Sequence, residues 1–185
     1  MLGTNRRTFG NIHGHVDGVS DMSSLTSWVG EQFDLQLDWD DVARIKDWWG
    51  GKLIIKGILD AEDAVLAVQS GADALIVSNH GGRQLDGADS SIALLPEIVA
   101  AVGDDIEVWM DGGIRSGQDM LKAVALGAQG TLLGRAFLYG LGAGGKSGVQ
   151  KALEIIHKEL DMTMALCGHR DIQNITRDIL RACPF

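Results

Sequence analysis

Cysteine, basic residues and long apolar runs are all scarce in this sequence, and each shortage excludes a class of protein. Two cysteines among 185 residues, with no CxxC spacing, are too few for a disulfide framework and favour a reducing, cytoplasmic setting. With 16 basic against 25 acidic side chains, the net charge of -9 leaves no broad basic face for nucleic acid. No apolar run approaches the roughly 20 residues that cross a bilayer, and no signal-peptide core follows the start. We therefore expect a soluble chain.

What the sequence does contain, from residue 52 onward, is an alternation of short apolar runs with helical patterns. Four strands are predicted, at residues 53–57, 74–78, 107–111 and 130–134. Because these runs are apolar almost throughout, we expect both faces of the strands to be buried. Asp60 and Ser116 are suitable N-caps for the helices that follow the first and third strands.

The helix-to-strand junctions at residues 70–74 and 126–130 resemble each other, and they lie two β-α units apart. This recurrence predicts a repeated barrel architecture. Four units make half of a (β/α)8 TIM barrel, with a long terminal helix from about residue 149 to 165 closing the outer ring. The predicted fold is thus α/β, the C-terminal half of such a barrel, spanning residues 52–185.

Residues 1–51 have a different character. They are polar and interrupted by glycine until a capped helix at about 38–49, so we expect a loop region followed by one outer-ring helix. In a barrel such a helix follows a strand, here the fourth, and the sequence offers none before it. An upstream segment is therefore expected to be missing.

The strongest functional signal is the run Ser-Asn-His-Gly-Gly-Arg-Gln-Leu-Asp at residues 78–86, directly after the second strand. In a barrel this end of a strand faces the active site. His80 offers a base that titrates near neutrality, and Arg83 offers a two-pronged donor for a carboxylate. The alternative is an ordinary turn with a locally bonded histidine and a solvated arginine. The convergence of base and anion donor favours the functional interpretation.

Two glycine-containing loops, at residues 111–117 after the third strand and 133–135 after the fourth, form the second signal. Backbone amides freed by glycine, a helix N-terminus and two guanidinium groups are suited to a phosphate dianion. A single glycine turn would be weak evidence, since many α/β proteins have one. Two on consecutive strands indicate phosphate binding.

Lys56, at the end of the first strand, is a third candidate, because an ammonium there can stabilise negative charge on a cofactor ring. A salt bridge or a snorkelling lysine is the alternative for this residue taken alone. His13 and His15 lack the companions of a metal site and are interpreted as loop residues. Cys167 and His169 are interpreted as a turn rather than a thiolate–imidazole pair. No metal is expected.

Together, Lys56 with its two following residues, 78–86, 111–117 and Gly134-Arg135 resemble the FMN-dependent 2-hydroxy-acid dehydrogenase and oxidase family. Its members, including lactate dehydrogenases, glycolate oxidases and mandelate dehydrogenases, are (β/α)8 barrels that hold FMN at the mouth. The similarity covers nearly the whole chain. Residues 9–21 and 165–168 resemble the bacterial L-lactate dehydrogenases of that family most.

The resemblance implies a role for each matching residue. His80 would be the catalytic base that takes the proton of the 2-hydroxyl, and Arg83 would bind the substrate carboxylate. Lys56 and Ser78 would contact the flavin ring. The ribityl chain and phosphate of FMN would be bound by Asp111, Gly112, Gly113, Arg115, Gly134 and Arg135.

The sequence also departs from the family, because the N-terminal half of the barrel is absent. That half supplies four strands, a tyrosine pair, a second arginine and an aspartate partner for the base. Two hypotheses follow: an enzyme completed by an upstream segment, or a non-catalytic half barrel that binds FMN weakly or pairs with itself. The partners expected are a 2-hydroxy acid, a quinone or other electron acceptor, and the missing half or another copy in a homo-oligomer. The full enzyme is expected in the cytoplasm or at the inner face of the membrane.

Overall fold

The computed structural model describes residues 12, 14–19 and 21–181 of a chain that divides into two compact units between Asp38 and Trp39. The first unit contains helix α1 (Met22–Glu31), where the sequence analysis predicted only loop. Asp21 begins this helix by accepting the Ser24 backbone N–H at 2.8 Å, and Ser24 in turn caps the Asp21 backbone. The helix was missed because this reciprocal cap has serine where glutamate or glutamine is the usual signal.

The second unit begins with α2 (Trp39–Trp49), which confirms the helix predicted near 38–49. The sequence pattern placed this helix with residues 1–51, whereas in the structure it belongs to the same compact unit as the sheet. Trp39 packs against the sheet's core, and Lys46 forms an ion pair with Asp73. No residue of α2 is fully buried, and Trp49 is 67% exposed.

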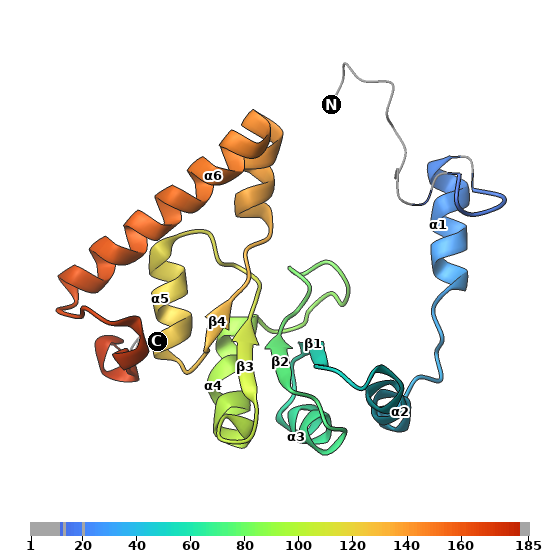
Figure 1. Ribbon diagram of the computed structural model, residues 1–185, viewed down its shortest axis with the longest axis horizontal. Helices are drawn as coiled ribbons and strands as arrows, with labels where there is room; N and C mark the ends of the chain where they lie inside the picture. Colours follow the sequence, from blue (N-terminus) through green and yellow to red (C-terminus); the bar gives the residue numbers. More distant parts are fainter. Residues whose placement is uncertain (1–11, 13, 20, 182–185) are drawn as a thin grey trace. The chain divides into compact units, whose positions relative to one another are not determined.

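Four parallel strands form one sheet in the order β1-β2-β3-β4, as Figure 1 shows. The strands are β1 (Ile54–Ile58), β2 (Ala74–Val77), β3 (Glu107–Met110) and β4 (Gly130–Thr131). All four predicted strands are confirmed, and their neighbouring order is that of half a (β/α)8 barrel. The pairing of β1 with β2 has an irregularity between Lys56 and Ile58, at Gly57, whose φ is +108°.

Helices follow each strand. They are α3 (Ala61–Gln69), α4 (Ser91–Val102), α5 (Gly117–Ala125) and α6 (Arg135–Leu166), with short 3-10 turns η1 (Ile172–Asn174) and η2 (Arg177–Ile179). Both predicted N-caps are confirmed: Asp60 accepts the Glu62 N–H at 2.7 Å, and Ser116 accepts the Asp119 N–H at 3.2 Å. The chain therefore starts these two helices by the local hydrogen bonds expected of aspartate and serine.

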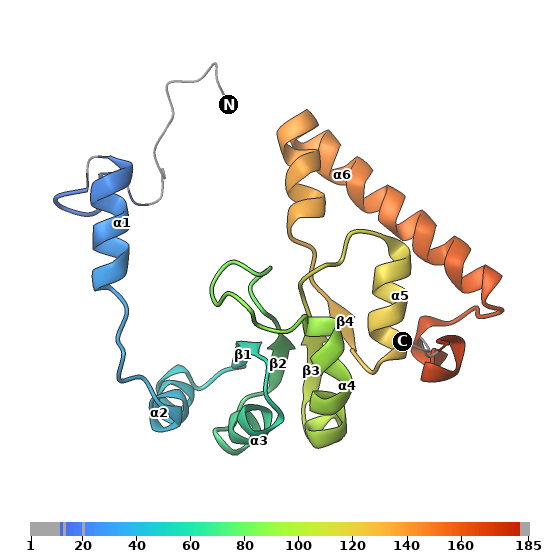
Figure 2. The ribbon, with the colours of Figure 1, turned by 180° about the vertical axis from the view of Figure 1, so that it is seen from behind.

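The terminal helix is longer than predicted. It begins at Arg135, and non-helical backbone angles at Gly144 and Gly145 divide it into two segments, seen as the bend of α6 in Figure 2. The first segment was not predicted, because glycine has low helix propensity. The Gly140 and Gly148 backbones meet so closely that a Cβ at Gly140 would lie 2.5 Å from the Gly148 carbonyl oxygen.

The core lies where α3 and α4 pack on one face of the sheet (Figures 1 and 2). A second cluster joins α5, α6 and the terminal turns. Burial on both faces was predicted for every strand, but only β2 is buried throughout. On β1 and β3 the residues alternate, leaving Ile54 58% and Trp109 36% exposed. The prediction was wrong there because no further strand of the described residues covers the second face. Among the same residues, no helix combines the length and apolar character needed to span a bilayer.

Candidate functional site

The carboxyl ends of β1, β2 and β3 bring three polar side chains together. Lys56 comes from β1, Ser78 directly follows β2, and Asp111 directly follows β3. The Lys56 Nζ lies 3.0 Å from the Ser78 Oγ and 3.1 Å from the Asp111 Oδ2. Because the strands are parallel and adjacent in the sheet, their ends meet at one edge, which is where barrel enzymes place their chemistry.

The Ser78 hydroxyl is the centre of this cluster. It is fully buried, donates to the Asp111 carboxylate, and accepts from the Lys56 ammonium and from the His80 backbone N–H at 3.0 Å. One hydroxyl thus links three strand ends to the loop that carries His80. The salt bridge considered for Lys56 is present, yet its side chain stays 37% exposed at the barrel mouth.

His80 is exposed, and its backbone adopts φ +55°, which makes it the non-glycine residue with positive φ among those described. Its ring lies against Gly57: a Cβ at that glycine would be 2.7 Å from the His80 Cε1. The φ of +108° at Gly57 disfavours other residues, and a side chain there would also displace the imidazole; neither constraint was predicted from the sequence. The imidazole therefore lies beside β1, at the position next in sequence to the Lys56 of the polar cluster.

The loop after His80 is held mainly by Asn79, a residue that the sequence analysis did not single out. Its Oδ1 accepts the N–H groups of Gly81 at 3.1 Å and Gly82 at 3.2 Å, and its Nδ2 donates to the Asp89 carbonyl at 3.2 Å. Arg83 lies exposed in this loop and forms no ion pair within the described part of the chain. Its role as a carboxylate donor stays a prediction.

The loop after β3 offers backbone amides to an anion. Gly112 and Gly113 have φ of +92° and +84°, a conformation that favours glycine, and space is open where a Gly113 side chain would stand. Backbone N–H groups in turns of this kind can form concave anion-binding sites. With the Lys56 ammonium nearby, these residues fit a cofactor that carries negative charge.

The start of α5 is less available than predicted, because side chains already satisfy its amides. The Asp119 carboxylate accepts the N–H groups of Arg115 at 3.0 Å and Ser116 at 3.1 Å. The Glu159 carboxylate of α6 accepts the Gly117 N–H at 3.1 Å. The N–H groups of Arg115, Ser116 and Gly117 are therefore not free to bind a phosphate, which leaves the preceding glycines as the candidates for that contact.

The fourth strand contributes Gly134 and Arg135, the N-cap and first residue of α6. The Arg135 Nη2 donates to the Gly81 carbonyl at 3.4 Å, so this side chain reaches the loop that follows His80. Its guanidinium thus connects the fourth-strand loop with the second-strand loop. Arg115 is exposed, and its side chain forms no ion pair among the described residues.

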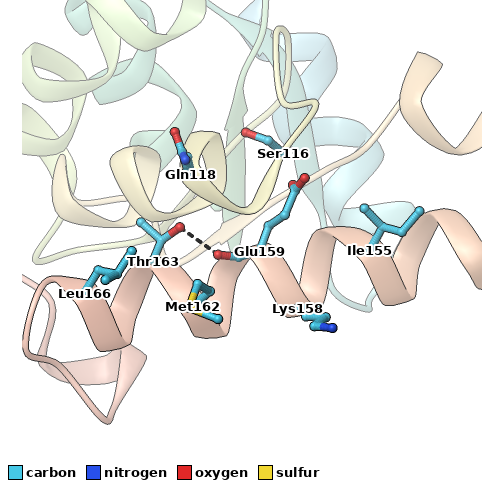
Figure 3. A pocket seen from close by; sticks show the side chains of 8 residues that line it. All are labelled: Ser116, Gln118, Ile155, Lys158, Glu159, Met162, Thr163 and Leu166. Atoms are coloured by element: carbon cyan, nitrogen blue, oxygen red, sulfur yellow. Dashed lines mark hydrogen bonds between the residues drawn. The ribbon is translucent and has the colours of Figure 1, made fainter.

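A separate groove of about 480 Å³ lies between the start of α5 and the second segment of α6 (Figure 3). Its walls include Ile155, Met162 and Leu166, with Glu159 and Thr163 between them. None of the predicted site residues lines it. No cluster of metal-ligating side chains occurs within the described ranges either, which leaves the strand ends as the candidate site.

Comparison with known proteins gives a consistent family. Residues 4–182 match the FMN-dependent dehydrogenase family. The chain is 49% identical over 173 residues to an L-lactate dehydrogenase of Actinobacillus pleuropneumoniae serotype 5b, covering 94% of this chain and 45% of the relative. It is 48% identical over 171 residues to an L-lactate dehydrogenase of Allorhizobium ampelinum, covering 92% and 45%. The chain thus spans less than half the length of these relatives.

Solved structures agree. A crystal structure of the monotopic membrane protein (S)-mandelate dehydrogenase is similar with a TM-score of 0.83 and 41% identity, over 90% of this chain and 44% of that one. A mandelate oxidase structure is similar with a TM-score of 0.73 and 46% identity, over 76% and 42%. The matched parts are similar in both sequence and fold. The chain belongs to the FMN-dependent dehydrogenase family.

Proposed function

We propose that this chain supplies the half of the barrel that carries the base and the phosphate site in an FMN-dependent L-2-hydroxy-acid dehydrogenase, with L-lactate oxidised to pyruvate. The observation that carries the proposal is the cluster of Lys56, Ser78 and Asp111 at three strand ends, with His80 fastened to it through Ser78. Relatives named L-lactate dehydrogenase support lactate as the substrate.

His80 is proposed as the base. When bound, FMN accepts the two electrons that the 2-hydroxy acid loses. A ring nitrogen of His80 takes the proton of the substrate's 2-hydroxyl, which is general-base catalysis by an imidazole. The imidazole is exposed above Gly57, so a substrate can reach it from the open side.

The cationic residues are proposed to bind anions. Arg83 holds the substrate carboxylate from its exposed loop, and Lys56 offsets negative charge on the flavin ring. Ser78 contacts the same ring. The ribityl chain and phosphate are bound by Asp111, Gly112, Gly113, Arg115, Gly134 and Arg135.

A complete site needs a partner segment. Since the chain covers 45% of the L-lactate dehydrogenases it matches, we propose that an N-terminal half barrel completes it, in a homo-oligomer that passes electrons to a quinone at the inner face of the membrane. The second candidate is a non-catalytic half barrel that binds FMN weakly or pairs with itself. The exposed apolar side chains of Ile54 and Trp109 on the open sheet face favour that alternative.

The test is flavin reduction. The purified chain is mixed with FMN, and the flavin absorbance is followed under anaerobic conditions after L-lactate is added. The same measurement is made after co-expression with the N-terminal half of an L-lactate dehydrogenase. Bleaching in either preparation supports the enzyme, and bleaching only after co-expression assigns the activity to the completed barrel.

The matched variant is His80→Gln, which keeps a polar side chain but removes the base. Flavin binding should persist while reduction falls by about 100-fold or more, the usual contribution of a general base. Undiminished reduction would refute the role of His80. If neither preparation bleaches, the non-catalytic alternative is the correct one.

A further inference from the structure

A buried hydroxyl at the start of α4 carries an inference about the loop of His80. Ser91 is 2% exposed, and its Oγ accepts the backbone N–H of Asn79 at 3.1 Å. The preceding Ser90 is the N-cap of α4, and its side chain forms no capping hydrogen bond. The helix start therefore directs a buried acceptor at the neighbouring strand end rather than at its own amides, which is where serines at helix starts usually bond.

Asn79 is thereby fixed through both its backbone and its side chain. Its N–H is bound by Ser91, and its amide group bonds to Gly81, Gly82 and Asp89. The next residue is His80. A left-handed backbone at a non-glycine residue is strained and persists only where the surroundings determine it.

The same two residues also contact the glycine loop after β3. A Cβ at Gly112 would lie 3.0 Å from the Ser91 Oγ and 3.2 Å from the Asn79 Oδ1. The Ser91–Asn79 pair therefore lies against the loop proposed to bind phosphate and is also hydrogen-bonded within the loop of His80.

We propose that Ser91 and Asn79 are positioning residues that hold His80 in its left-handed conformation, with the imidazole against Gly57. The inference rests on the proposed role of His80 as the base. Neither residue touches the reacting atoms in this assignment. Both act through His80 by fixing the residue before it and the two residues after it.

The test compares two adjacent serines. Ser91→Ala removes the buried acceptor, and Ser90→Ala removes a hydroxyl of the same helix start that makes no capping bond. The readout is the nuclear Overhauser effect between the Hε1 of His80 and the Hα protons of Gly57, assigned by its disappearance in His80→Gln. We expect Ser91→Ala to reduce this signal at least twofold and Ser90→Ala to leave it unchanged.

A second pair of variants covers the case in which Ser91→Ala does not fold. Asn79→Ala removes the side-chain acceptor of the loop, whereas Asn79→Asp keeps an oxygen for the Gly81 and Gly82 amides. The signal should fall in the first and be retained in the second, with the thermal unfolding midpoint of both close to that of the parent chain. A signal unchanged in Ser91→Ala and in Asn79→Ala would overturn the proposal, as would an equal loss in Ser90→Ala.

This readout separates the inference from the proposed function, because it requires neither FMN nor turnover. If flavin is reduced neither by the chain alone nor after co-expression, but Ser91→Ala alone moves the imidazole, the positioning of His80 stands and the proposed function fails. In a preparation that does reduce flavin, Ser91→Ala should lower kcat about tenfold or more and leave the KM for L-lactate unchanged. A change confined to KM would contradict positioning of the base.

Discussion

Two carboxylates at opposite ends of the same sheet have similar partners. Asp73 precedes β2 and pairs with Lys46 of α2 and, at 2.6 Å, with Lys52 before β1. Asp111 follows β3 and pairs with Lys56 at 3.1 Å. At the amino ends, the carboxylate also accepts the backbone N–H of the residue that leads into β1. At the carboxyl ends, it accepts a buried hydroxyl instead.

Lysine–carboxylate ion pairs therefore occur at both ends of the sheet, but the elements that they connect differ. Hydrogen bonds from Lys46 and Lys52 hold the pKa of Asp73 well below its ordinary value of 3.8. All three residues link scaffold elements: a helix and the starts of two strands. Asp111, Lys56 and Ser78 instead lie next to the glycine loop after β3 and the loop of His80. In parallel barrels, conserved stability features are expected at the amino ends and ligand contacts at the carboxyl ends.

The largest effect is expected from removing one lysine at each end. Lys56→Met should weaken FMN binding at least about tenfold, or about 1.4 kcal/mol, because it removes the cation and leaves the Asp111 carboxylate unpaired beside an anionic cofactor. Lys52→Met removes the same residue type at the other end and should leave FMN affinity unchanged. The measurement is the dissociation constant from quenching of FMN fluorescence. Equal losses in both variants would abolish the distinction between the two ends.

An intermediate effect is expected from Asp73→Asn on acid stability. A carboxylate whose folded pKa is lowered contributes stability above its unfolded pKa, about 4, and that contribution is lost as the pH falls through the folded value. The parent chain should therefore lose stability from about pH 4 downward, and the variant should be less stable at pH 7 with a flatter acid limb. Urea unfolding at a series of pH values measures both.

The control for this change is Asp104→Asn, at an exposed carboxylate in the turn after α4. Its pH profile should follow that of the parent. If Asp73→Asn also follows the parent, Lys46 and Lys52 do not stabilise the fold through Asp73, and the amino-end network has no structural role. A loss of FMN affinity in Asp73→Asn would likewise contradict the comparison.

How much was predictable from the sequence differs between local and non-local features. The strands and the caps at Asp60 and Ser116 were predicted, because apolar runs and capping residues act on their own neighbours. The kink at Gly144 and Gly145 was not predicted. It accompanies a close backbone contact between Gly140 and Gly148, which lie on the two different segments of α6.

For the candidate site, the positions of the residues were predictable, and their roles stay predictions. His80, Ser78 and the glycines after β3 stand in contiguous motifs, so the sequence placed them at the carboxyl ends of the strands. The contributions of Gly57 and Ser91 depend on contacts with residues 23 and 12 positions away, which no local pattern encodes. The buried hydroxyl of Ser91 resembles an ordinary helix-start serine until its acceptor geometry is seen.

The smallest effect concerns a polar group that belongs to neither network. The Thr131 hydroxyl on β4 is buried and has no hydrogen-bond partner among the described residues. Thr131→Val keeps the branched shape and removes the unsatisfied hydroxyl, so it should raise the free energy of unfolding by up to about 1 kcal/mol. Thr163→Val is the control, because the Thr163 hydroxyl donates to the Glu159 carbonyl at 2.6 Å and should give no gain. Urea midpoints compare the two. Destabilisation by Thr131→Val would mean that the Thr131 hydroxyl does form a stabilising hydrogen bond, in addition to the polar contacts at the two ends of the sheet.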